Sequence, residues 1–161
     1  DRYMQCAALF EHPVASEELC ASIADMFRGG RVDVVAGPAL GGVILAYEVA
    51  RSLGVRNIFA ERENGKMTFR RGFHVNPGER VLVVEDVVTT GGSVREVIEL
   101  LRETGAEVAG VGAVVDRSGG SVDFGVPFRP LMCMEARKWE ESECPLCREG
   151  IPIDKPGSRA V

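Results

Sequence analysis

Two adjacent carboxylates and a run of small and hydroxyl residues form the stretch of this sequence with the clearest capacity for chemistry. The stretch reads Val-Val-Glu-Asp-Val-Val-Thr-Thr-Gly-Gly-Ser over residues 83–93. Backbone N–H groups of such a turn, at the start of a helix, can cradle a phosphate monoester. Glu85 and Asp86 can accept hydrogen bonds from the vicinal hydroxyls of a sugar, or attract a divalent cation through water. The alternative is an ordinary strand–turn–helix junction whose acids are solvated.

Basic residues gather in a second segment, residues 61–79, which has little apolar periodicity. Arg62, Lys66, Arg70 and Arg71 stand there among glycines. We predict a long loop or a mobile hairpin, because long segments without a regular pattern inside a compact domain are usually functional or disordered. A solvated basic loop without a function is the alternative.

Cys144 and Cys147 form a Cys-Pro-Leu-Cys pair, which has the spacing of half a tetrahedral zinc site. Cys133, His12 or His74, or a second subunit, would have to complete such a site. A structural turn and a labile disulfide are the alternatives. The five cysteines are odd in number and have no regular framework, which favours a reducing, cytoplasmic setting.

Apolar runs typical of buried strands alternate with segments of helical period along the chain. This alternation predicts an α/β fold with a central, mostly parallel sheet flanked by helices. We place the uninterrupted apolar run 81–84 at the centre of the sheet. The predicted helices cover residues 16–28, 42–53 and 92–104, and the other predicted strands cover residues 32–36, 55–60, 108–115 and 128–134.

The chain as a whole, residues 1–161, has the composition of one globular domain. It is 45% hydrophobic and 27% charged, with a formal net charge of −5, which disfavours general binding to nucleic acid or to an anionic membrane. No apolar run approaches the roughly 18 residues that span a bilayer. From about residue 139 the chain is polar and rich in proline, so we expect a C-terminal tail or small hood there.

The motif at 83–93 resembles the 5-phosphoribosyl 1-pyrophosphate (PRPP) signature of the type I phosphoribosyltransferases. Other stretches extend the likeness to the bacterial and archaeal orotate phosphoribosyltransferases, and they are residues 37–42, 60–62, 116–117, 144–147 and 155–159. The likeness covers nearly the whole chain. Residues 1–5 resemble the point just after a base-covering loop of that family, so we expect a further N-terminal segment upstream.

The resemblance implies a role for each matching residue. Glu85 and Asp86 would bind the ribose hydroxyls of PRPP, and Arg117 would bind the carboxylate of orotate with two parallel hydrogen bonds. Thr89 would also touch orotate. The 5′-phosphate would be wrapped by Val87, Val88, Thr89, Thr90, Gly91, Gly92 and Ser93.

The resemblance also implies how the leaving group is bound. A pyrophosphate loop would comprise Pro38, Ala39, Leu40 and Gly41. Many family members have a lysine where this chain has Leu40, so backbone amides become the expected donors. Arg62 and Lys66 would offset the leaving-group charge together with Mg²⁺. Asp86, Arg62 and Lys66 are therefore the expected catalytic residues.

The implied activity is Mg²⁺-dependent transfer of the phosphoribosyl group from PRPP to orotate, in a cytoplasmic homodimer whose active sites share loops. A purine phosphoribosyltransferase is one alternative, because the fold and the PRPP site would be the same while the acceptor base differs. A PRPP-sensing regulator that binds nucleic acid and lacks catalysis is the other alternative. The net charge of −5 argues against the regulator.

Overall fold

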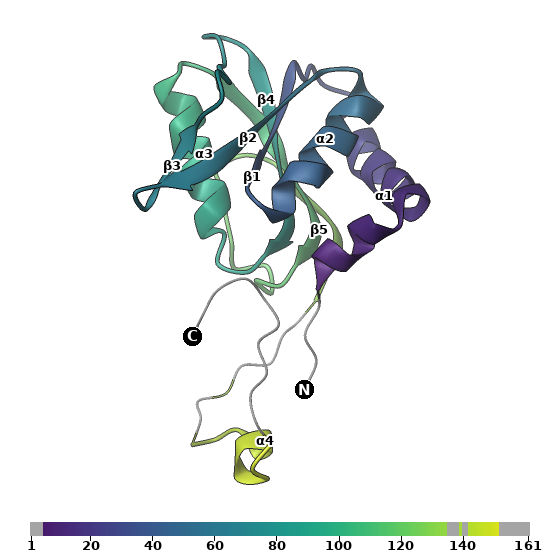
Figure 1. Cartoon of the computed structure of the whole chain (residues 1–161), viewed down its shortest axis with the longest axis vertical. Coiled ribbons are helices and arrows are strands. Elements are labelled where there is room, and N and C mark those ends of the chain that lie inside the picture. Colours follow the sequence, from purple (N-terminus) through teal and green to yellow (C-terminus); the bar gives the residue numbers. More distant parts are fainter. Residues whose placement is uncertain (1–4, 135–138, 140–141, 152–161) are drawn as a thin grey trace.

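A computed structural model describes residues 5–134, 139 and 142–151 of the chain. Within them, six strands form one sheet in the order β3-β2-β1-β4-β5-β6, with β4 among the central strands as predicted (Figure 1). All neighbouring strands are parallel except β3, which is antiparallel to β2. The strands are β1 (Val34–Pro38), β2 (Arg56–Glu63), β3 (Lys66–Phe69), β4 (Arg80–Val88), β5 (Glu107–Asp116) and β6 (Phe128–Cys133).

Helices cover both faces of this sheet, which confirms the predicted α/β class. The helices α1 (Pro13–Asp25) and α2 (Gly41–Leu53) pack on one face, and α3 (Gly92–Glu103) packs on the other (Figure 1). A 3₁₀ helix, η1 (Cys6–Glu11), precedes α1, and a single helical turn, α4 (Pro145–Arg148), lies near the end of the described residues. None of the described helices is long and apolar enough to cross a membrane.

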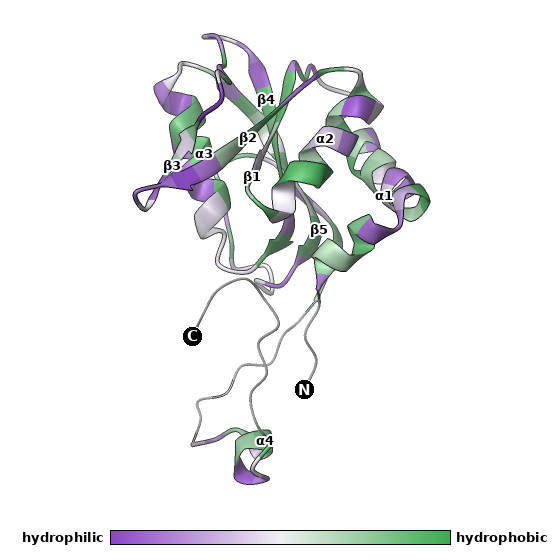
Figure 2. Ribbon diagram, viewed as in Figure 1, coloured by the Kyte–Doolittle hydropathy of each residue, from purple (hydrophilic) through white to green (hydrophobic). Residues whose placement is uncertain are grey.

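Strand β4 shows why the sheet needs helices on both sides. Val81 and Val83 belong to the core beneath α3, whereas Leu82 and Val84 belong to the core beneath α1 and α2. Successive side chains of a strand point to opposite faces, so an uninterrupted apolar run is stable only when both faces are covered. Figure 2 accordingly shows hydrophobic residues along the central strands and hydrophilic residues on the β2–β3 hairpin.

Several predicted boundaries differ from the structure, and the strand predicted over 32–36 is β1 at Val34–Pro38. The helix predicted over 16–28 runs from Pro13 to Asp25, because proline suits the first turn of a helix, where its missing N–H has no partner to lose. The segment 61–79, for which we predict a long loop or a mobile hairpin, contains a hairpin at its start. Strand β2 continues to Glu63, and the turn at Asn64 and Gly65, with φ of 50° and 81°, leads directly into β3. Positive φ at both turn residues matches the right-handed twist of paired strands.

Candidate active site at the carboxyl edge of the sheet

The carboxyl ends of the parallel strands bring the predicted site residues to one edge of the sheet. Strand β1 ends at Pro38, and β4 ends with its acidic pair and Val88. Val88 is paired in register with Asp116, the last residue of β5. The backbone N–H of Arg117 donates to the carbonyl oxygen of Val88 at 2.8 Å. The predicted base-binding arginine therefore lies directly beside the predicted PRPP motif.

The acidic pair is held rigidly by its own backbone. Glu85 is 9% exposed, and its Oε1 accepts a hydrogen bond from the N–H of Asp86 at 3.2 Å. Asp86 is half-buried, and its Oδ1 accepts a hydrogen bond from the N–H of Val87 at 2.8 Å. These bonds fix carboxylate oxygens at the strand end, where they can accept hydrogen bonds from sugar hydroxyls.

Asp86 also joins the motif to the predicted pyrophosphate loop. A Cβ atom built on Gly41 would lie 2.6 Å from Oδ2 and 2.8 Å from Oδ1 of Asp86. Only glycine permits this approach of loop backbone to carboxylate. The loop contains a cis peptide bond between Ala39 and Leu40, and the N–H of Ala39 donates to the carbonyl oxygen of Ala60 at 2.8 Å. Gly41 of the predicted pyrophosphate loop thus lies against Asp86.

The turn after β4 presents backbone donors. Thr89 and Thr90 are exposed, and no hydrogen bond within the described part of the chain uses the N–H groups of Thr89, Thr90 or Gly91. Gly91 adopts φ 74° immediately before α3, and a Cβ atom there would lie 2.8 Å from the Phe124 ring. The first turn of α3 adds N–H groups that point out of the helix N-terminus. This arrangement can bind an anionic group such as a phosphate.

Arg117 is half-buried, and its guanidinium makes no hydrogen bond or ion pair with the residues that the structure describes. A neighbour that the sequence did not single out is Cys6 of η1. Burial, with a smaller effect from the charge of Asp86, raises the pKa of the Cys6 thiol to about 11, and the charge of Arg117 acts in the opposite direction. Cys6 of η1 therefore lies near both Asp86 and Arg117. A six-residue 3₁₀ helix has no long apolar period, so the sequence pattern does not predict it.

The basic residues of the hairpin are largely paired with carboxylates. The guanidinium of Arg62 donates to the carbonyl oxygen of Gly65 at 2.9 Å and contacts Oε1 of Glu96 on α3 at 2.5 Å. Arg71 makes a two-bond pair with Glu61 at 2.8 and 2.9 Å.

The remaining two bases of the hairpin differ from each other. The guanidinium of Arg70 lies 3.4 Å from the carboxylate of Glu63. Lys66 is exposed at the start of β3, directly opposite Glu63 in the hairpin register, and has no ion pair with another described residue. Lys66 is therefore the hairpin cation that can turn to a ligand without breaking an ion pair.

Beside the pyrophosphate loop is a largely apolar cavity of about 450 Å³. Its walls come from the loop and α2, from η1, and from β2 with the ion pair of Glu61 and Arg71. Leu40 and Ile44 border it and are 83% and 50% exposed, and Tyr47, one turn further along α2, is 55% exposed. Leu40, Ile44 and Tyr47 follow one another at helical spacing, so their exposed side chains can form one contact surface.

The two cysteines of the predicted zinc half-site lie at α4. Hydrogen bonds from the backbone N–H and side chain of Cys147 lower the pKa of the Cys144 thiol. Within residues 5–134, 139 and 142–151, no third His, Cys, Asp or Glu joins them in a group that could hold a metal ion. Much of the predicted tail, and the stretch at 155–159, lies outside the described residues.

Comparison with known proteins agrees with this geometry. Residues 7–124 match the model of the phosphoribosyl transferase domain family. The chain is 61% identical to the orotate phosphoribosyltransferase of Caldanaerobacter subterraneus subsp. tengcongensis over 161 residues, which is 100% of this chain and 85% of that protein. It is 58% identical to the orotate phosphoribosyltransferase of Thermotoga maritima over 160 residues, which is 99% of this chain and 86% of that protein.

Solved structures with lower identity share the fold. Adenine phosphoribosyltransferase from Thermoanaerobacter pseudethanolicus superposes with a TM-score of 0.69 at 18% identity, covering 78% of this chain and 84% of that one. UMP synthase from Leishmania donovani also gives a TM-score of 0.69, at 24% identity, covering 82% of this chain and 30% of that one.

Proposed function

Because this chain belongs to the orotate phosphoribosyltransferases, within the phosphoribosyl transferase domain family, we propose that the carboxyl edge of its sheet is the active site for that reaction. The reaction transfers the 5-phosphoribosyl group of PRPP to orotate and yields orotidine 5′-monophosphate and pyrophosphate, a step of pyrimidine nucleotide synthesis. The bond from ribose C1 to pyrophosphate breaks as N1 of orotate forms the new bond to C1.

The observation that carries the PRPP site is the acidic pair followed directly by a turn rich in available N–H groups. Glu85 and Asp86 accept hydrogen bonds from the ribose hydroxyls, and the backbone of residues 87–93 surrounds the 5′-phosphate. The start of α3 adds a favourable dipole for the phosphate charge. One PRPP molecule can contact the acidic pair and the N–H groups of the turn together, because β4 and α3 are joined by only three residues.

Arg117 places the acceptor base. Its backbone is tied to Val88, and its guanidinium makes no bond to other described residues, so it can face a ligand at the carboxyl edge. A guanidinium matches a carboxylate with two parallel hydrogen bonds, and orotate carries a carboxylate. Thr89 is exposed and directly follows Val88, whose carbonyl oxygen accepts a hydrogen bond from the N–H of Arg117. Thr89 can therefore contact both PRPP and the base.

The pyrophosphate is bound by the amides of residues 38–41, with Leu40 contributing backbone only. Lys66 supplies a positive charge from the hairpin, and Arg62 can do the same only after leaving Glu96. A charge placed where negative charge develops on the leaving group lowers the barrier. Closure of the hairpin over the site would exclude water, which could otherwise hydrolyse PRPP.

We propose magnesium as the cofactor of this chemistry, and the residues present fit it. Mg²⁺ usually keeps several waters and binds through one or two carboxylates together with substrate phosphates. Glu85 and Asp86 offer such carboxylates at the end of β4. When bound with PRPP, magnesium neutralises charge on the leaving pyrophosphate.

A second copy of the chain is the partner that fits the exposed apolar surface of Leu40, Ile44 and Tyr47. This surface borders the pyrophosphate loop, so a homodimer formed there would bring residues of one subunit next to the active site of the other. Analytical ultracentrifugation should detect a dimer, and Ile44→Asp should shift it to monomer. A monomer at micromolar concentration in the unaltered protein would contradict this assembly.

The remaining features suit a cytoplasmic enzyme. The five cysteines are free thiols, which is compatible with a reducing compartment. We also propose that residues 1–161 form a single domain, because the described strands belong to one continuous sheet.

The acceptor is tested by mixing the protein with PRPP and Mg²⁺ and following loss of orotate absorbance. Adenine, hypoxanthine and uracil are run in parallel with product detection. Turnover of orotate alone is expected. Turnover of another base would keep the PRPP site but remove the role of Arg117. Tight PRPP binding without turnover of any base would favour a PRPP-sensing regulator, whose binding to nucleic acid should fall steeply as salt rises.

A further inference from the structure

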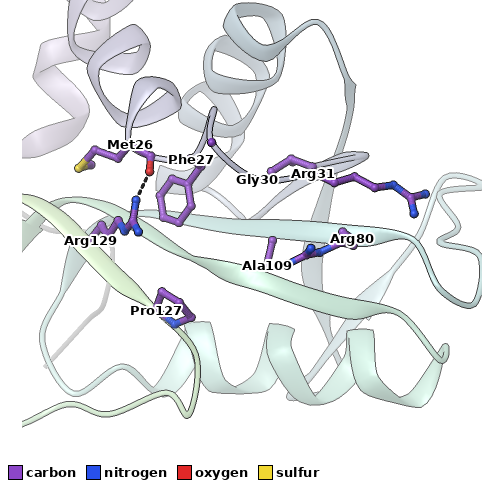
Figure 3. Close-up of a pocket in the computed structure, with 10 residues that line it drawn as sticks. Met26, Phe27, Gly30, Arg31, Arg80, Ala109, Pro127 and Arg129 are labelled. Carbon is purple, nitrogen blue, oxygen red and sulfur yellow. Dashed lines mark hydrogen bonds between the residues drawn. The ribbon is translucent and has the colours of Figure 1, made fainter.

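A second cavity, of about 300 Å³, lies at the opposite, amino-terminal edge of the sheet. It is formed where the turn after α1 meets the beginning of β4, the first half of β5 and the residues just before and within β6 (Figure 3). We call it the arginine pocket, because Arg31, Arg80 and Arg129 line it. Arg80 begins β4 and Val88 ends it, so this pocket is roughly 25 Å from the substrate site at about 3.3 Å per residue.

Two of these arginines have guanidinium N–H groups that donate no hydrogen bond to another described residue. The Nε atom of Arg80 is buried without a hydrogen-bond partner among the described residues, and it forms a long ion pair of 3.9 Å with the carboxylate of Glu107. The backbone N–H of Arg80 donates to Oδ2 of Asp33 at 2.8 Å. Arg129 donates one hydrogen bond to the carbonyl oxygen of Met26 and lies over the Phe27 ring at 5.2 Å (Figure 3). A guanidinium has five N–H donors, so both retain unused ones.

Arg31 differs from the other two. It pairs with Asp33 at 2.9 Å, and Figure 3 shows its side chain extending away from Arg80 and Arg129. The available positive charge of the pocket therefore comes from Arg80 and Arg129, which belong to different strands. The Arg80 side chain is 40% exposed although its Nε is buried, so a bound anion can contact the rest of its guanidinium.

We propose that the arginine pocket binds a small phosphate-bearing anion. Two guanidiniums on different strands suit a tetrahedral phosphate, which offers several oxygens, whereas one guanidinium already satisfies both oxygens of a carboxylate. The rings of Phe27 and Pro127 supply apolar walls, and the volume is at the low end of small-molecule pockets. The occupant is therefore inorganic phosphate or a compact phosphomonoester, at a site separate from the one that binds PRPP.

The test is a titration of ¹⁵N-labelled protein with inorganic phosphate, followed by NMR of the backbone amides. Two separate groups of amides should shift, namely Gly29, Gly30 and Ala109 around the arginine pocket and residues 89–93 at the active site. Acetate at the same ionic strength should not shift the first group. Arg80→Met, which keeps the apolar stem of the side chain, should weaken phosphate binding in the pocket tenfold or more and leave the shifts at 89–93 unchanged.

Two further variants keep the result interpretable. Arg129→Met should act like Arg80→Met, because it removes the other guanidinium of the pocket. Arg102→Met, which removes an exposed arginine of α3 outside the pocket, controls for net charge and should leave both sets of shifts intact. The proposal is overturned if Gly29, Gly30 and Ala109 do not respond to phosphate, or if they respond equally in Arg80→Met. Loss of the shifts at 89–93 alone would instead count against the proposed PRPP site.

Discussion

Gly41 and Asp86 are packed so closely that they act as one structural unit between the two halves of the proposed substrate site. Gly41→Ala would place a methyl group within 2.8 Å of both carboxylate oxygens of Asp86, so the carboxylate or the loop must move. We expect kcat/KM for PRPP to fall about tenfold or more, since small misplacements of binding groups cost that much. Steady-state kinetics with PRPP as the varied substrate measure this.

The matched control is Gly29→Ala, because a Cβ atom at Gly29 meets nothing within 4 Å. It should keep the kinetics of the unaltered protein. Unchanged kinetics in Gly41→Ala as well would show that the position of Asp86 is not critical.

The thiols of this protein should differ widely in reactivity at the residue level. Burial raises the pKa of Cys6 to about 11 and that of Cys20 to about 12, so their thiolate fractions at pH 8 are very small. Hydrogen bonds from Cys147 lower the pKa of Cys144 instead. Because the thiolate is the nucleophile, iodoacetamide should modify Cys144 well before Cys6 and Cys20.

Peptide mass spectrometry at timed intervals gives the order of modification. In denaturant Cys6 and Cys20 should react readily, which serves as the control for accessibility. Early modification of Cys6 in the folded protein would contradict the position of η1 against the carboxyl edge.

The β2–β3 hairpin is the element whose function depends most on a single side chain. Lys66→Ala should lower kcat about tenfold to a hundredfold, because Lys66 is the hairpin cation without an ion pair and removing a charge that stabilises a leaving group has such effects. Arg70→Ala, in the same hairpin but paired with Glu63, should change kcat far less. Equal losses in both variants would mean that the hairpin acts through its total charge.

At the same scale, regular periodicity explains which elements could be predicted. The helix at 92–104 was predicted within one residue, because Val94, Val97, Ile98 and Leu101 follow the helical period and all are buried. The hairpin pattern was weak because β3 is short and its residues are only partly buried. The pairing of Arg71 with Glu61, and of Arg62 with Glu96, depends on where the elements pack, and no local pattern carries that information.

For the whole molecule, stability should fall in acid. The N–H of Arg80 lowers the pKa of Asp33 from its ordinary value of 3.8, and the N–H of Asn76 lowers that of Glu79 from 4.5. A carboxyl with a lower pKa in the folded state binds protons mainly when unfolded, so its contribution is present above the ordinary value and is lost as pH falls through the folded value. Urea unfolding at pH 7 and below pH 4.5 should show this decrease.

Asp33→Asn should reduce the pH dependence, because it removes one of these titrating groups. Glu99→Gln, at an exposed position of α3, is the control for the loss of one negative charge. A free energy of unfolding that is constant or rises between pH 4.5 and pH 3 would contradict the role of these carboxylates.

Chain topology also explains which parts of the sites could be predicted. Most of the proposed substrate site follows the ends of predicted parallel strands, namely residues 38–41, 85–93 and 117. Because the carboxyl ends of parallel strands meet at one edge of the sheet, their common location can be predicted from the sequence. The arginine pocket combines residues 31, 80 and 129, which are far apart in sequence and share no motif. The helix η1 is not predicted for a different reason, because a six-residue 3₁₀ helix has no long apolar period.

The most direct test of the proposed site is the kinetics of Arg117→Ala, measured with orotate and PRPP varied in turn. The KM for orotate should rise tenfold or more, because a charge-assisted pair with the orotate carboxylate is lost, while the KM for PRPP should change less than about twofold. Arg117→Lys should recover only part of the loss, since lysine cannot form two parallel bonds. Equal increases in both KM values would contradict the assignment of Arg117 to orotate.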